Sequence, residues 1–179
     1  MITATKTKKR SSFSHFHPAP AAPRPTSKRS FADDPFFARF GHKLPAGLRD
    51  EARNMQWRTF AATYAPATDL RLQFTNVTKL RGNNLRFSAT MTYSNPHQRR
   101  VETTEITASG AASAATQLLA NAGRRVEIAS FHQFEIFEAT VTFILAVDND
   151  RKHWAMGFGS TREQSVATAL SNAAYLLHG

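Results

Sequence analysis

The sequence feature that most constrains the fold is an internal repeat. The same order of three alternating apolar segments and a helix of small residues occurs twice along the chain. Residues about 52 positions apart are expected to play equal roles: Phe87 with Ala139, Ala89 with Val141, and Ser113-Ala114-Ala115-Thr116 with Ser165-Val166-Ala167-Thr168. The repeat predicts one domain over residues 67–179, built from two βββα units at about 67–123 and 124–179.

The hydrophobic periodicity gives the elements of each unit. In the first unit, strands are expected over residues 70–74, 85–93 and 101–106, followed by a helix over 111–122 that ends at Gly123. In the second unit, strands are expected over 126–131, 139–147 and 154–158, followed by a helix that Thr161 caps. Each sheet has an apolar face and a face of Thr, Ser, Arg and Gln, which indicates antiparallel strands covered on one side.

The segment before the repeat changes to a helical period. Apolar residues recur at roughly helical spacing from Leu48 to Tyr64, and Pro66 stops the run. We expect about two linker helices within residues 31–66, with order starting near Phe31. The predicted fold class is therefore α+β: two pseudo-symmetric βββα units with antiparallel sheets, preceded by linker helices and a disordered basic tail. A core this small favours pairing with a second copy, so we expect a homodimer.

The net charge of +10 is concentrated in the tail. Residues 1–32 contain seven Lys and Arg residues and no acid, and residues 1–30 also contain four prolines among Ser, Thr and Ala. Such a composition predicts a disordered segment. The tail is interpreted either as a solvated leader or as a nonspecific electrostatic contact with nucleic acid or an acidic partner, assisted by Phe13 and Phe16.

Composition excludes several classes of function. The absence of cysteine excludes disulfide scaffolds, Cys-zinc sites and thiol catalysis. No apolar run approaches the roughly 18 residues of a membrane span, and no secretory signal is recognised, so we expect no membrane contact and a cytoplasmic location. His15-Phe16-His17 lacks a third ligand, and we expect neither a metal nor a cofactor. Arg99-Arg100 and Arg124-Arg125 are interpreted as solvated turn charges, or as an anion site across a dimer.

Three motifs occur in order at suitable distances. They are Trp57-x-x-Phe60-x-x-x-Tyr64-x-Pro66, Ile106-x-x-x-Gly110 before an Ala-rich helix, and Trp154-Ala155-Met156-Gly157-Phe158 before a helix with Ser165, Ala169, Leu170 and Ala173. Together they resemble the C-terminal allosteric and dimerisation domain of α-isopropylmalate synthase, an enzyme of leucine biosynthesis. The resemblance extends from about Leu44 to Leu177. The catalytic TIM barrel of that family needs roughly 250 residues and is not in this sequence, so we expect no enzymatic activity.

The resemblance implies a binding site for leucine or a related amino acid between the paired units. Carried over by position, the ligand-binding residues would be Gly110, Ala112, Ala114, Ala115, Ile128, Phe131, Phe158 and Ser160. The family loop usually reads G-x-G-x-G-P, whereas this chain has Ala108, Ala112 and Ser113 at the first, fifth and sixth positions. The added methyl groups are expected either to narrow the pocket or to forbid positive φ where the turn needs it.

Three hypotheses of function follow. The chain is a stand-alone regulatory domain that binds a small amino acid and regulates a synthase in trans. Alternatively, it is a dimerisation or adaptor module whose ligand pocket has degenerated. The third hypothesis is a nucleic-acid-associated protein that acts through residues 1–30.

Overall fold

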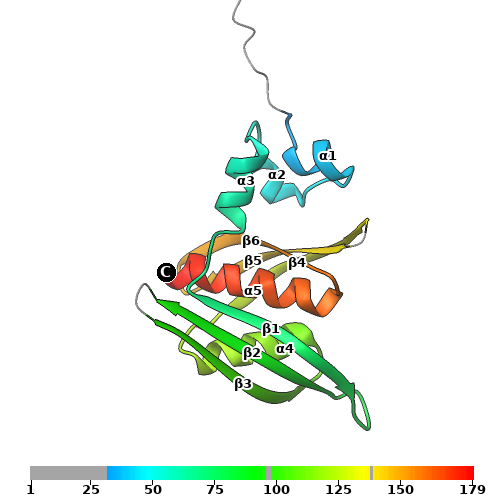
Figure 1. Ribbon diagram of the computed structural model, residues 1–179. Coiled ribbons are helices and arrows are strands. Elements are labelled where there is room, and N and C mark those ends of the chain that lie inside the picture. The colour runs from blue at the N-terminus through cyan, green and yellow to red at the C-terminus, as the bar shows by residue number, and fades with distance from the viewer. Residues whose placement is uncertain (1–31, 96–97, 138) are drawn as a thin grey trace, which may run out of the picture.

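The computed structural model describes residues 32–95, 98–137 and 139–179 (Figure 1). The predictions for the tail, for His15-Phe16-His17 and for order at Phe31 lie outside these residues. The elements, in chain order, are α1 (Pro35–Phe40), α2 (Ala46–Glu51), α3 (Trp57–Tyr64), β1 (Leu70–Lys79), β2 (Leu85–Asn95), β3 (Gln98–Ala108), α4 (Ala111–Asn121), β4 (Glu127–Ile136), β5 (Ala139–Asp148), β6 (Arg151–Gly159) and α5 (Arg162–His178).

Two three-stranded antiparallel sheets, ordered β1-β2-β3 and β4-β5-β6, are each followed by a helix. The predicted α+β class with two βββα units is therefore confirmed. Gly123 adopts a φ of 79° after α4, as expected for the end of that helix, and Asn149 adopts a φ of 52° in the two-residue turn between β5 and β6. Within the described residues, no helix is long and apolar enough to cross a membrane.

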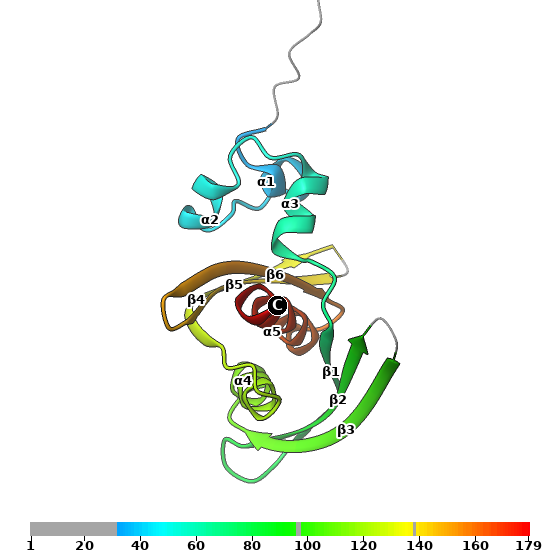
Figure 2. The ribbon, with the colours of Figure 1, turned by 90° about the vertical axis from the view of Figure 1, so that its left-hand side faces the viewer.

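Helix α5 lies between the two sheets, with α4 beside it against the first sheet (Figure 2). Its buried positions include Val166, Ala169, Leu170 and Ala173. On its other side, the Ser171 hydroxyl accepts a hydrogen bond of 2.9 Å from the backbone N–H of Leu72 on β1. The C-terminal helix therefore joins the two units into one core.

The residues predicted to be equivalent in the two units are not equivalent in the structure, and the prediction is displaced by an odd number of residues. Leu85 lies opposite Ala108, two residues before the N-cap of α4, and Thr140 lies opposite Gly159, two residues before the N-cap of α5. Ala89 therefore corresponds to Ile144, and both pack in the cluster around α5. Val141, the predicted partner of Ala89, instead packs against the N-terminal helices. An odd slip along a strand moves a side chain to the other face of the sheet.

By the same correspondence, Phe87 matches Thr142 rather than Ala139, and Ser113 matches Gln164 rather than Ser165. The two predicted helix segments are thus displaced by a single residue.

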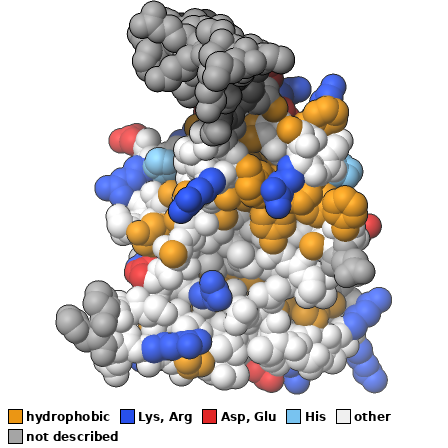
Figure 3. Space-filling model, turned by 45° about the horizontal axis from the view of Figure 1, so that its top comes forward, with side chains coloured by type: hydrophobic (Ala, Val, Ile, Leu, Met, Phe, Trp, Pro, Cys, Tyr) orange, Lys and Arg blue, Asp and Glu red, His pale blue; other side chains and the backbone are white. Residues whose placement is uncertain are grey.

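The second sheet is covered on both faces, contrary to the prediction. Its outer face packs Val141, Phe143 and Met156 against helices α1 to α3, which number three rather than two. The ring of Phe36 on α1 meets the ring of Phe143 edge-on at 5.0 Å between centroids. These helices still leave apolar side chains among Lys and Arg on the surface (Figure 3). Phe37 on α1 is 48 % exposed.

An ion pair holds the start of the first unit against the start of the second. The Arg124 guanidinium donates to both carboxylate oxygens of Asp69, with the Nη1–Oδ1 bond at 2.8 Å. Burial alone would raise the pKa of Asp69, but the hydrogen bonds and charge of Arg124 and two backbone hydrogen bonds together lower it. Arg124 is therefore not a solvated turn charge, whereas its neighbour Arg125 is exposed.

Candidate functional site

The best candidate for a ligand site is a groove between the two units, with a volume of about 300 Å³. It lies where the first turns of α4 and α5 approach β2 of one unit and β4 of the other. The lining residues are Leu85, Phe87, Gly110, Ala111, Ala112, Phe131, Gln133, Arg162, Glu163 and Val166. We call this set the inter-unit groove. Its volume is at the small end of the range typical of ligand pockets.

Three of the eight predicted ligand-binding residues, Gly110, Ala112 and Phe131, line the inter-unit groove. Phe131 is 43 % exposed on the edge strand β4, so its ring is accessible to a ligand in the groove. The groove thus brings together the helix start of the first unit and a strand of the second, as the resemblance implies for a pocket between paired units.

The structure places the other five predicted residues elsewhere. Ala114 and Ala115 are fully buried behind the first turn of α4, and Ile128 packs against the core around α5. Phe158 faces the N-terminal helices, with its ring 6.0 Å from that of Phe40. Ser160 lines a separate hollow beside Phe137 at the tip of the β4–β5 hairpin.

The backbone angles of the loop before α4 show whether alanine in place of the family's glycines strains this loop. Gly110 has φ −175° and ψ 170°, an extended conformation that any residue adopts, and a Cβ added there would meet nothing within 4 Å. The positive φ angles of the described residues lie elsewhere in the chain. Ala108 and Ala112 therefore impose no backbone strain. Of the two, Ala112 lines the groove, where its methyl group narrows the space, and Ala108 is buried beside Phe87.

The two helix starts at the groove differ in their capping. Thr161 caps α5 by accepting a hydrogen bond of 3.2 Å from the N–H of Gln164. Gly110 has no side chain to cap α4, so the first N–H groups of that helix stay free for another acceptor. Together with the helix dipole, these donors favour a negatively charged group at the α4 end of the groove.

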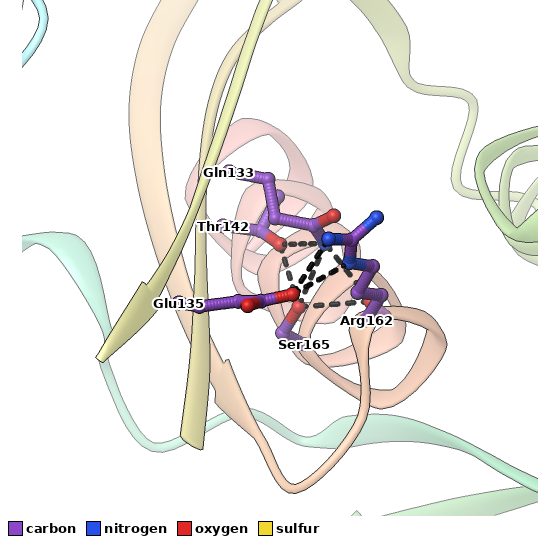
Figure 4. A network of polar contacts seen from close by, with 5 residues as sticks. All are labelled: Gln133, Glu135, Thr142, Arg162 and Ser165. Atoms are coloured by element: carbon purple, nitrogen blue, oxygen red, sulfur yellow. Dashed lines mark hydrogen bonds and ion pairs between the residues drawn. The ribbon is translucent and has the colours of Figure 1, made fainter. Parts of the chain in front are cut away.

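A polar network forms one wall of the groove (Figure 4). The side-chain amide of Gln133 on β4 donates to Thr142 Oγ1 at 2.9 Å and lies 3.1 Å from Ser165 Oγ and from the carbonyl oxygen of Arg162. The Thr142 and Ser165 hydroxyls are fully buried and 2.7 Å apart. This network fixes Gln133 and the first turn of α5, which gives the wall a rigid base.

The charged groups of the groove come from the first turn of α5. Arg162 Nη2 donates to Glu135 Oε1 at 2.6 Å, and Nε of the same guanidinium donates to this oxygen at 3.1 Å (Figure 4). Glu163, the next residue, supplies a carboxylate that also lines the groove. The site therefore combines a cation, an anion and the apolar side chains of Phe87, Phe131 and Val166.

Sequence reasoning missed Gln133, Arg162 and Glu163. Gln133 is two residues after Phe131, and the alternation of a strand puts both side chains on one face, so this signal was present in the sequence. Arg162 and Glu163 directly follow the predicted cap Thr161, but nothing local shows that α5 starts beside α4.

Among residues 32–95, 98–137 and 139–179, no group of three potential ligands is placed to hold a metal ion. Comparison with known protein families and with curated proteins finds no match.

Proposed function

We propose that the inter-unit groove binds a small α-amino acid with an apolar side chain, leucine or a relative. The observation that carries this proposal is the adjacency of opposite charges and apolar walls in one small groove. An α-amino acid carries a carboxylate, an ammonium group and a side chain on one carbon. Arg162 and the uncapped start of α4 suit the carboxylate, Glu163 suits the ammonium group, and Phe131 and Val166 suit an isobutyl group.

The proposed biological role is regulation rather than catalysis. The proposal extends the resemblance to the leucine-feedback domain of α-isopropylmalate synthase: ligand binding between the units would alter how they pack and would be read by a synthase in trans. The groove is formed by both units, so a ligand that contacts both stabilises their arrangement by its differential affinity.

The test is thermal unfolding of the full chain with each of the twenty amino acids and the branched-chain oxo acids. A ligand at 100 times its Kd stabilises a protein by about 2.7 kcal/mol, which corresponds to roughly 5–10 °C for a domain of this size. Ala112→Met places a longer side chain in the groove and should abolish the shift. Ala120→Met, on the exposed side of the same helix, is the matched control and should retain it. No shift with any compound on a well-folded parent would refute amino-acid binding.

A specific observation favours dimerisation as a second candidate function. Helix α4 leaves part of the inner face of the first sheet uncovered, where Met91, Tyr93, Glu102, Thr104, Leu118, Asn121 and Ala122 line a hollow of about 170 Å³. The adjacent strand β3 is an edge strand of 11 residues. A long edge strand is a template for pairing with another chain. Analytical ultracentrifugation of the parent and of Thr104→Lys should show a dimer that the substitution weakens; a monomeric parent at high concentration would contradict this candidate.

A further inference from the structure

A second hollow, of about 270 Å³, lies on the outer face of the first sheet. The sheet itself creates it, because long side chains on the two outer strands flank short ones on the central strand. The lining residues are Thr68, Arg71, Gln73, Thr92, Ser94 and Arg99. This face points away from α4 and α5, so the hollow is separate from the inter-unit groove.

The strand register places the two arginines on opposite sides of the central strand. Arg71 on β1 lies opposite Thr92 on β2, and Arg99 on β3 lies opposite Ser94. With strands about 4.8 Å apart, the Cα atoms of the two arginines are separated by roughly 12 Å along the diagonal. Two extended arginine side chains span that distance. Their guanidinium groups are therefore able to reach one ligand seated over the hydroxyls of Thr92 and Ser94.

The charged side chains that line this hollow are both positive, which favours an anion as its ligand. None of its lining residues is acidic. In the described part of the chain, neither Arg71 nor Arg99 forms an ion pair, whereas Arg100 pairs with Glu102 and Arg124 pairs with Asp69. Arg99 and Arg100 point to opposite faces of the sheet, so the neighbouring carboxylate that neutralises Arg100 does not reach Arg99.

We propose that this hollow binds the phosphate group of a small phosphorylated molecule. Two guanidinium groups approach from opposite sides, and two hydroxyls and the Gln73 amide add further donors. Such an arrangement fits a tetrahedral dianion with several acceptor oxygens better than a planar carboxylate with two. The site does not depend on amino-acid binding in the inter-unit groove, and it is formed within one chain rather than across a dimer.

Titration of the full chain with inorganic phosphate, followed by ¹H–¹⁵N NMR at constant ionic strength, tests this proposal. The backbone amides of Thr92 and Ser94 and the side-chain Nε–H groups of Arg71 and Arg99 should shift with one common saturation curve. Acetate at the same ionic strength should bind at least several-fold more weakly. Arg71→Gln and Arg99→Gln should each weaken phosphate binding about tenfold, as expected for the loss of one charge-assisted contact.

Arg86→Gln is the matched control, because Arg86 is an exposed arginine of the same strand face that does not line the hollow. It should change phosphate binding less than twofold. Equal losses for all three variants would overturn the proposal, since they would indicate general attraction to a basic surface. The proposal would also be overturned if a single-stranded oligonucleotide bound far more tightly than phosphate and the salt dependence of its affinity corresponded to several phosphate contacts. That result would indicate a nucleic-acid surface.

Discussion

Gly157→Ala is the substitution with the most direct consequence for this fold. Gly157 lies on the face of β6 that contacts α5, next to Ala155 and Gly159, and the backbones of strand and helix touch there. A Cβ at position 157 would lie 2.1 Å from the backbone nitrogen of Ala169 and 2.6 Å from both Ala169 Cα and the carbonyl oxygen of Ser165. Ordinary contacts are about 3.5–4.0 Å, so relieving the contact with the Ala169 nitrogen would require α5 to move away by roughly 1.4–1.9 Å.

The loss of stability caused by this displacement depends on the elements that α5 packs against. A gap of 0.5–1 Å already loses a quarter to a half of the dispersion energy across an interface, and α5 contacts β1, β5 and β6 at once. We therefore expect Gly157→Ala to lower the free energy of unfolding by about 4 kcal/mol, at the upper end of overpacking effects. For a domain of this size the melting temperature should fall by roughly 8–16 °C.

Urea unfolding at 10 °C, followed by tryptophan fluorescence and by far-UV circular dichroism, measures this loss. Gly110→Ala is the control, because a Cβ at that position meets nothing within 4 Å and its backbone is extended. Its cost should stay below about 1 kcal/mol, the loss expected at a helix N-cap. A Gly157→Ala protein within 1 kcal/mol of the parent would refute direct backbone contact between β6 and α5.

Two further predictions concern pH. Asp69→Asn should lower the free energy of unfolding by about 1 kcal/mol at pH 7, a modest value because the ion pair with Arg124 is partly exposed. The pKa of Asp69 is lowered on folding, so the difference in stability between parent and variant should be constant above about pH 4 and should disappear as the pH falls through the folded-state pKa. Burial, together with the charge and hydrogen bond of Glu51, raises the pKa of Tyr64 to about 12. The parent should therefore lose about 2 kcal/mol of stability between pH 10 and 12, because the unfolded chain loses this proton first. Tyr64→Phe should lose less over the same range, as measured by urea midpoints.

The strands and helices of the two units were predictable from sequence because their signals are local. Apolar residues at every second position from Ala139 to Val147 locate β5, which the structure extends by one residue to Asp148. Small residues bounded by Gly110 and Gly123 locate α4. In each case a turn or cap residue fixes the boundary, and no distant contact is needed to identify it.

The packing of helices α1 to α3 on the outer face of the β4–β5–β6 sheet was not predicted, because it depends on contacts between segments about 100 residues apart. Phe36 packs on Phe143 only after the chain has folded back. The sequence nevertheless carries a signal for it: residues 143–147 are all apolar, without the alternation expected of a strand with one solvated face. Strands buried on both faces typically show such runs. β5 is therefore recognisable as a central strand between two packed layers.

The candidate site shows why the repeat predicts the fold better than the function. With the corrected pairing, Val77, Phe87 and Ala114 in the first unit correspond to Gln133, Thr142 and Ser165 in the second. All three residues of the first set are apolar, and Phe87 and Ala114 pack in one cluster, whereas the second set forms the hydrogen-bonded wall of the groove.

Equivalent backbone positions thus carry opposite chemistry: Phe87 corresponds to Thr142, and Ala114 corresponds to Ser165. Phe87 can offer a ligand only an apolar contact, so the polar contacts in the groove would come from the start of α4, from β4 and from α5. An amino acid bound there would have one orientation, with its charged end toward the helix starts and its side chain toward Phe87 and Phe131. If the groove binds an amino acid as proposed, this divergence between the two units would let it distinguish the two ends of the ligand.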